Sequence, residues 1–140
     1  MHSNAQKKTE NNQVQFKSTI HGSDIVWLHM PQKGRGVFAG RAIAKDEIIE
    51  ISPVIPMSKD LVPDDTTLDH YAFRWKPEVP GEECCLPLGY CMMYNHSDKP
   101  NMNMSLDFED KSVTMTANRD ILEGEELTWD YDCQIWFEVK

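Results

Sequence analysis

The sequence predicts a mainly β domain assembled from many short strands. No stretch carries a long amphipathic-helix pattern, whereas residues 102–117 alternate between apolar and polar side chains. Glycine, proline and acidic residues separate the apolar stretches, as is typical of turns between strands. The chain has 140 residues, of which 40% are hydrophobic and 26% charged, and this suits one globular domain with one core.

The N-terminal residues 1–14 are polar and rich in Asn, Gln and Lys. We expect them to form a disordered tail, with a single ordered domain over residues 15–140. They lack the apolar block of a secretory signal, and no apolar run approaches the roughly 20 residues needed to span a bilayer. The sequence therefore indicates an intracellular protein.

In the first half of the chain, residues 24–30 predict an opening strand. Gly34 and Gly36 predict a loop that leads into a short apolar strand. Two glycines one residue apart let the backbone turn sharply and let a ligand approach the main chain, although a plain hairpin turn is the alternative. Residues 48–55 predict the next strand, in which Pro53 indicates a sheet edge or a bulge.

In the second half, residues 66–75 predict a short helix or an extended segment whose aromatic side chains mostly belong to the core. Residues 86–93 form the most apolar run and are expected to be buried. The alternation over residues 102–117 predicts a β-hairpin with one buried face, turning at residues 108–111. Residues 124–131 predict a turn followed by the last strand.

Between the apolar run and the hairpin lies the polar stretch Y-N-H-S-D-K-P-N, residues 94–101. Its side chains carry many hydrogen-bonding groups, which must be satisfied if the stretch lies between two core segments. Taken alone, it predicts a turn closed by Pro100 and Asn101, with Asn95 and Ser97 bonded to nearby backbone.

The formal net charge of −9, from 14 basic and 23 acidic residues, disfavours nucleic acid and membrane surfaces as direct partners. An acidic surface would suit a basic peptide instead. The four cysteines contain no C-x-x-C pair, so we expect free thiols in a reducing compartment and no metal site.

Three separated motifs occur in a set order: K-G-R-G-V-F-A at residues 33–39, the polar stretch at 94–101, and G-E-E-L-T-W-D-Y at 124–131. Together they resemble the SET domain, the S-adenosylmethionine-dependent protein lysine methyltransferase fold, over residues 25–137. Without cysteine-rich zinc segments on either side, the chain most resembles the small stand-alone SET proteins of viruses and bacteria. The resemblance implies a SET (β-clip) fold of several short sheets, few short helices and a C-terminal pseudoknot.

The resemblance also implies which residues hold S-adenosylmethionine. The first motif would contact its methionine portion through the backbone. Asn95 would lie near its amino-acid end, and His96 would contact its adenine through the backbone. Trp136 is the candidate for the wall beside the adenine, with a core or dimer-interface position as the alternative. The implied cofactor-binding residues are Lys33, Gly34, Arg35, Gly36, Tyr94, Asn95, His96 and Trp136.

By the same resemblance, Tyr131 is the catalytic tyrosine, with its hydroxyl facing the transferring methyl group. Methyl transfer needs a neutral amine, whereas lysine has a reference pKa of about 10.4. The site must therefore favour the free amine, and an uncharged phenol suits this better than a carboxylate, which would hold an ammonium. Weaker candidates for lining the substrate channel are Tyr71, Tyr90, Met104 and Cys133. For the two tyrosines, a core position is the alternative.

The leading hypothesis is therefore a protein lysine N-methyltransferase acting on a histone tail or another basic protein segment. Its location would be the nucleus for a eukaryotic or viral protein and the cytoplasm for a bacterial one. The first alternative is a non-catalytic SET-fold binding or scaffold module. The second is a small β interaction domain in which the glycines and residues 95–101 are turns. Apolar residues near the C-terminus further suggest a homodimer.

Overall fold

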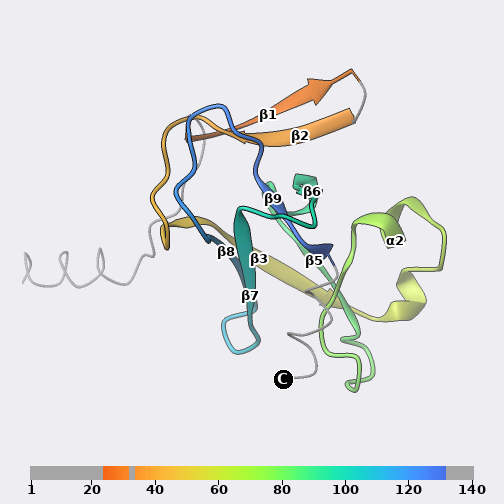
Figure 1. Ribbon diagram of the computed structural model, residues 1–140. Coiled ribbons are helices and arrows are strands. Elements are labelled where there is room, and N and C mark those ends of the chain that lie inside the picture. The colour runs from red at the N-terminus through yellow and green to blue at the C-terminus, as the bar shows by residue number, and fades with distance from the viewer. Residues whose placement is uncertain (1–23, 32–33, 132–140) are drawn as a thin grey trace, which may run out of the picture.

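The computed structural model describes residues 24–31 and 34–131, and it is mainly β, as predicted (Figure 1). The polar tail at 1–14 and three candidate site residues, Lys33, Cys133 and Trp136, lie outside the described residues. None of the described helices is long and apolar enough to cross a membrane. The strands are β1 (Ile25–Met30), β2 (Gly34–Ala39), β3 (Ile48–Met57), β4 (Phe73–Arg74), β5 (Cys84–Pro87), β6 (Asn95–His96), β7 (Met102–Asp107), β8 (Ser112–Ala117) and β9 (Thr128–Trp129). The helical elements are α2 (Thr67–Tyr71) and the 3-10 turns η2 (Lys59–Leu61) and η3 (Cys91–Met93).

The hairpin of β1 and β2 carries the first motif. Its antiparallel register runs from Ile25 opposite Ala39 to Met30 opposite Gly34. The predicted glycine loop is therefore wrong in position, because the ladder continues through both glycines and Gly36 lies inside β2. The hairpin is fixed to the rest of the molecule by a bridge between Phe38 and Glu126.

The long strand β3 is central in the five-stranded sheet, whose order is β4-β5-β3-β8-β7. It pairs with β8 over Ile48–Pro53 and with β5 over Val54–Met57. The edge position predicted from Pro53 is wrong. The proline is tolerated in a central strand because β3 changes partner immediately after it. A register shift does occur, but between Ile48 and Glu50.

The hairpin of β7 and β8 confirms the predicted alternation, with Met102 opposite Ala117 and Asp107 opposite Ser112. Its apolar face joins a core that contains Ile49, Trp75 and Met115. Burying a side chain of this size contributes about 1.5–3 kcal/mol relative to leaving it exposed. One contiguous core thus holds the sheet together.

The prediction that the whole run of residues 86–93 is buried is wrong at the centre of the run. Leu88 is 43% exposed, because the chain leaves β5 at Pro87 and turns at Gly89, where φ is +81°. This left-handed turn leads into η3, whose Cys91 is fully buried.

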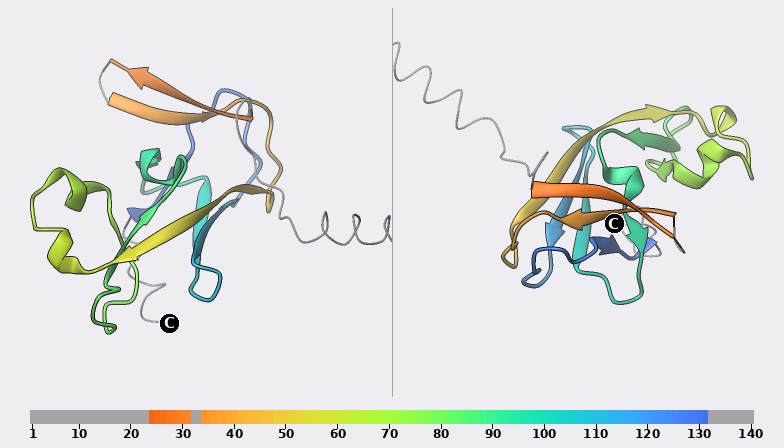
Figure 2. Two further views of the ribbon diagram at one scale, coloured as in Figure 1. Left: turned by 180° about the vertical axis from the view of Figure 1, so that it is seen from behind. Right: turned by 90° about the horizontal axis from the view of Figure 1, so that it is seen from above.

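The short strands β6 and β9 bring the second and third motifs side by side. They pair in parallel, with Asn95 opposite Thr128 and His96 opposite Trp129. Figure 1 and Figure 2 show this pair between the β1–β2 hairpin and the five-stranded sheet. The predicted C-terminal pseudoknot stays a prediction, because the chain beyond residue 131 lies outside the described residues.

Candidate active site

A cavity of about 440 Å3 lies where the three motifs meet, within the range of about 300–1,000 Å3 usual for small-molecule sites. Its walls come from both strands of the first hairpin, the α2–β4 segment, the η3–β6 segment and the last strand. The lining residues are His29, Gly34, Arg35, His70, Tyr71, Ala72, Phe73, Cys91, Met92, Met93, Tyr94, Asn95, Trp129 and Tyr131. Segments far apart in the sequence thus form one concave surface.

Tyr131 lies at this cavity and is 44% exposed. Its hydroxyl donates a hydrogen bond of 2.5 Å to the backbone carbonyl of Tyr94, and its ring lies 4.9 Å from that of Trp129. Partial burial, followed by electrostatic interaction with Tyr71 and then with Glu126, raises the pKa of the Tyr131 phenol. The hydroxyl is therefore neutral at physiological pH and has a defined direction.

His96 holds the backbone of Tyr131 from outside the cavity. The backbone N–H of Tyr131 donates to Nδ1 of His96 at 3.1 Å, and the two rings lie 5.2 Å apart. Because Nδ1 is the acceptor in this hydrogen bond, the 3.6 Å approach of Asp130 Oδ1 to the same nitrogen is not a second hydrogen bond. The His96 side chain thus anchors the end of the last strand.

Asn95 joins all three motifs. Its side-chain Nδ2 donates to the backbone carbonyl of Arg35 at 2.9 Å and to Oε2 of Glu126 at 2.8 Å. Both amide hydrogens are thereby used, which fixes the orientation of the amide oxygen at the cavity. Sequence reasoning did not select Glu126, although it is the second acidic residue of the third motif.

Gly36 lets the side chains of Asn95 and Glu126 come together. It is not among the residues that line the cavity. A Cβ atom at Gly36 would lie 2.6 Å from Oε2 of Glu126 and 3.1 Å from Nδ2 of Asn95. The glycine therefore makes room for the Asn95–Glu126 hydrogen bond.

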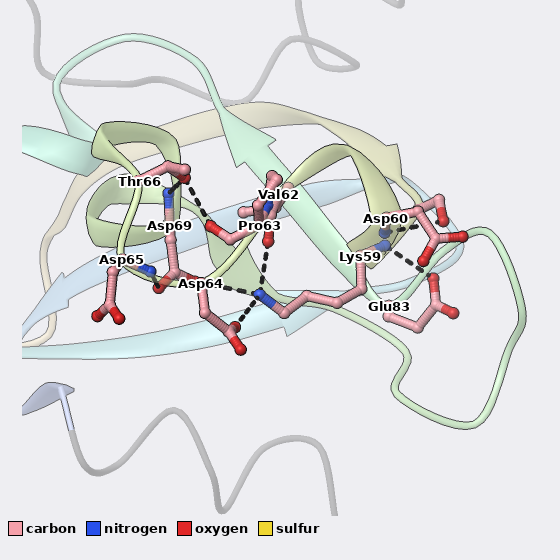
Figure 3. Close-up of polar contacts among 10 residues, drawn as sticks. Lys59, Asp60, Val62, Pro63, Asp64, Asp65, Thr66, Asp69 and Glu83 are labelled. Carbon is pink, nitrogen blue, oxygen red and sulfur yellow. Dashed lines mark hydrogen bonds and ion pairs between the residues drawn. The ribbon is translucent and has the colours of Figure 1, made fainter.

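Lys59 fixes the loop that leads to α2 (Figure 3). Its ammonium group donates to the backbone carbonyl of Val62 at 2.6 Å, to Asp64 at 2.9 Å and to Asp69 at 3.2 Å. These carboxylates raise the pKa of Lys59. Thr66 caps the helix by accepting from the backbone N–H of Asp69 at 3.3 Å. The loop thereby fixes where the helix begins.

The end of α2 brings Tyr71 and Phe73 to the cavity. Tyr71 is 40% exposed and Phe73 is buried, with its ring 5.2 Å from that of Trp129. The prediction that the aromatic side chains of this segment are mostly core holds for Phe73 and Trp75.

Tyr94 is buried beneath the cavity. Its hydroxyl donates to Oε1 of Glu50 at 2.8 Å, while its backbone carbonyl accepts the bond from Tyr131. Burial, reinforced by the charge of Glu50, raises the pKa of Tyr94 well above 10. The phenol therefore remains a hydrogen-bond donor.

Two predicted channel residues lie away from this cavity. Tyr90 packs against the core, and its backbone N–H donates to Oε2 of Glu50 at 2.8 Å. Met104 is buried on β7, in the apolar face of the hairpin, and lines a separate groove. The alternation that buries Met104 explains why its side chain belongs to the core.

The predicted residues that the structure brings to the cavity are Gly34, Arg35, Tyr71, Tyr94, Asn95 and Tyr131. Sequence reasoning missed His29, His70, Phe73 and Trp129, which also line it. The sequence could have predicted two of these, because His70 precedes Tyr71 and Trp129 belongs to the third motif. Within the described part of the chain, no group of three or more His, Cys, Asp or Glu side chains is arranged to hold a metal ion.

The SET domain family model matches residues 34–132. A histone-lysine N-methyltransferase of Schizosaccharomyces pombe, specific for lysine 37 of histone H3, is 36% identical over 110 residues, which cover 76% of this chain and 72% of the yeast protein. A candidate histone methyltransferase of Plasmodium falciparum has a similar structure, with a TM-score of 0.62, 29% identity and coverage of 79% of this chain and 95% of that one.

A SET domain histone lysine methyltransferase of Neurospora shares the fold at 22% identity, with a TM-score of 0.58. The match covers 76% of this chain and 51% of the Neurospora chain.

Proposed function

This chain belongs to the SET domain family, and from that premise we propose that it is an S-adenosylmethionine-dependent protein lysine N-methyltransferase. Its substrate would be the ε-amine of a lysine in a histone tail or another basic protein segment. The observation that carries the proposal is the meeting of all three motifs at one cavity, where Tyr131 presents a neutral, oriented hydroxyl.

The chemistry of the cavity fits S-adenosylmethionine. Tyr71, Phe73, Trp129 and Tyr131 line it with aromatic rings, which attract a cationic sulfonium. His29 and Arg35 offer cationic or polar groups for a carboxylate. Gly34, Arg35 and Asn95 would hold the amino-acid portion. When bound, S-adenosylmethionine supplies an electrophilic methyl group on a positively charged sulfur.

The residues of the cavity favour a neutral target lysine. No aspartate or glutamate is among the described residues that line it, so an incoming ammonium would be desolvated without an ion pair. Desolvation lowers the pKa of a lysine and releases its proton to water. The hydroxyl of Tyr131 is fixed by Tyr94 and can orient the amine for in-line attack. Such positioning supplies a large part of the rate enhancement, on the order of 7–11 kcal/mol in favourable cases.

A basic protein segment suits this site. The chain carries a net charge of −9, which favours encounter with a positively charged tail. The yeast relative acts on lysine 37 of histone H3, and a histone substrate would place the present protein in the nucleus. The alternative is a SET-fold binding module without transferase activity.

Two measurements test the proposal. Calorimetry should detect binding of S-adenosylmethionine, and labelled methyl transfer to histones and to a lysate should detect activity. Replacing Tyr131 by Phe removes the oriented hydroxyl and should lower the transfer rate about 10²-fold, a loss typical of misplacing or removing one positioned group. The matched control is Tyr90→Phe, whose phenol lies outside the cavity, and it should retain activity.

The outcomes separate the hypotheses. Binding without transfer, equal in wild type and Tyr131→Phe, would support the non-catalytic module. If S-adenosylmethionine does not bind at all, both hypotheses, the enzyme and the non-catalytic SET-fold binding module, would be eliminated.

A further inference from the structure

Glu50 is a carboxylate with 0% exposure in the middle of β3, next to the site but outside the cavity. Burying an ionisable group is costly unless its oxygens receive hydrogen bonds. The methyl-transfer chemistry described above does not use Glu50 directly. The burial of this carboxylate therefore needs another explanation.

A bulge aims this side chain inward. In a regular strand consecutive side chains point to opposite faces, yet Ile49 and Glu50 are both fully buried. The register of β3 against β8 shifts between Ile48 and Glu50. Bulges re-aim side chains in this way and are frequent beside active sites.

Each carboxylate oxygen of Glu50 receives a hydrogen bond from the segment that leads into the cavity. Oε1 accepts from the hydroxyl of Tyr94 at 2.8 Å, and Oε2 accepts from the backbone N–H of Tyr90 at 2.8 Å. The turn is packed so closely that a Cβ atom at Gly89 would lie 2.5 Å from Oε2. The carboxylate thus fixes both ends of residues 90–94.

Tyr94 links this buried carboxylate to the reacting group, because its backbone carbonyl accepts the hydrogen bond from Tyr131. Asn95, in contrast, has anchors of its own on Arg35 and Glu126. Disturbing Glu50 should therefore displace the hydroxyl of Tyr131 more than the cofactor-holding amide of Asn95.

We propose that Glu50 is a positioning residue for methyl transfer, which acts by holding Tyr94 so that the Tyr94 carbonyl directs the hydroxyl of Tyr131. The role in catalysis rests on the proposed methyltransferase function. The mechanical link from Glu50 to Tyr131 can be tested without it.

The test compares Glu50→Gln, Tyr94→Phe and the double variant with wild type. An amide cannot accept from both donors as a carboxylate does, and Phe removes the donor. We expect each single variant to lower kcat about tenfold or more, since small misplacements near the chemistry have large effects. The dissociation constant for S-adenosylmethionine should change by less than about threefold. Because both variants break the same hydrogen bond, their effects on kcat should not multiply in the double variant.

The second readout is independent of activity. With ring-labelled tyrosine, the NMR signal of Tyr131, assigned through Tyr131→Phe, should shift in both single variants. The matched control is Ile49→Val, which removes one buried methyl group from the adjacent position and should lower the melting temperature without moving this signal.

An unchanged Tyr131 signal in Glu50→Gln and Tyr94→Phe would overturn the proposal, as would losses of kcat no larger than that of Ile49→Val at equal folded fraction. If wild type transfers no methyl group, the proposed function fails, while the NMR comparison still decides the link. If Glu50→Gln does not fold, Tyr94→Phe alone decides it by the same two readouts.

Discussion

Gly36 shows how one absent side chain shapes the site. The space where a Cβ atom would lie is taken by Oε2 of Glu126, by the methyl group of Met30 and by Nδ2 of Asn95. Two of these atoms are the ends of flexible side chains, which can move at modest cost. A substitution at Gly36 is therefore expected to change the site more than the stability of the fold.

Replacing Gly36 by Ala should push Glu126 away from Asn95 and release the amide of Asn95. We expect the dissociation constant for S-adenosylmethionine to rise up to about tenfold, because the released Asn95 side chain would have to be ordered again on binding, at a cost of about 0.5–1.5 kcal/mol. Calorimetry measures this, and urea unfolding should show a stability change below about 1 kcal/mol.

The control for Gly36→Ala is Gly124→Ala. Gly124 has φ +88° and no atom near its missing Cβ, so alanine there strains the backbone without entering the site. That variant should lose about 1–2 kcal/mol of stability and keep its affinity. The explanation of Gly36 would be incorrect if both variants bound S-adenosylmethionine equally well.

At the scale of elements, the contact between β7 and β9 depends on Asn101. This side chain is 2% exposed, donates to the carbonyl of Glu126 at 2.8 Å and accepts from the N–H of Thr128 at 2.9 Å. It thus satisfies two backbone groups of a segment whose regular pairing spans two residues. The role predicted for Asn101, closing a turn, missed this longer-range contact.

Asn101→Ala should leave both backbone groups unpaired. At about 1–3 kcal/mol for each unsatisfied buried group, we expect a loss of about 2–6 kcal/mol, measured by urea unfolding. Asn103→Ala is the matched control, because Asn103 lies just after Asn101, exposed on β7, and it should lose less than about 0.5 kcal/mol. Equal losses in the two variants would show that the Asn101 contacts add little.

The elements differ in how well the sequence predicts them, and the reason is the range of the interactions that form them. The β7–β8 hairpin was predictable because its alternation and its turn are both local. The β6–β9 pair was not, because two residues carry no periodicity and their partners lie more than thirty positions away. The cavity depends on that pair, so the sequence did not predict that His29, from the first hairpin, would lie beside residues of the second and third motifs. Only the order of the three motifs indicated that their residues meet.

At the scale of the whole molecule, three small sheets share one core, and their junction forms the cavity. The predicted homodimer and the likeness to viral and bacterial family members in particular stay predictions. Light scattering at working concentration can check whether the protein forms the homodimer.

Two buried groups, the thiol of Cys91 and the phenol of Tyr94, hold their protons more strongly in the folded protein than in the unfolded chain. Burial, with the nearby charge of Glu50 second, raises the pKa of Cys91 well above 9 and that of Tyr94 well above 10. In the unfolded chain these groups ionise near pH 8.5 and 10. Their contribution to stability is therefore fully present below the unfolded pKa values and is lost as the pH rises.

Between pH 8 and 11, the unfolded chain binds fewer protons than the folded protein, so the free energy of unfolding should fall as the pH increases. The slope should approach about 1.4 kcal/mol per pH unit for each group once the pH exceeds its unfolded pKa. Urea unfolding at pH 8, 9, 10 and 11 measures it. Cys91→Ala should flatten the curve from about pH 9 and Tyr94→Phe from about pH 10. Ile49→Val, which removes no titratable group, should lower the whole curve without changing its slope. A wild-type curve that is flat to pH 11 would mean that neither proton is held by the fold.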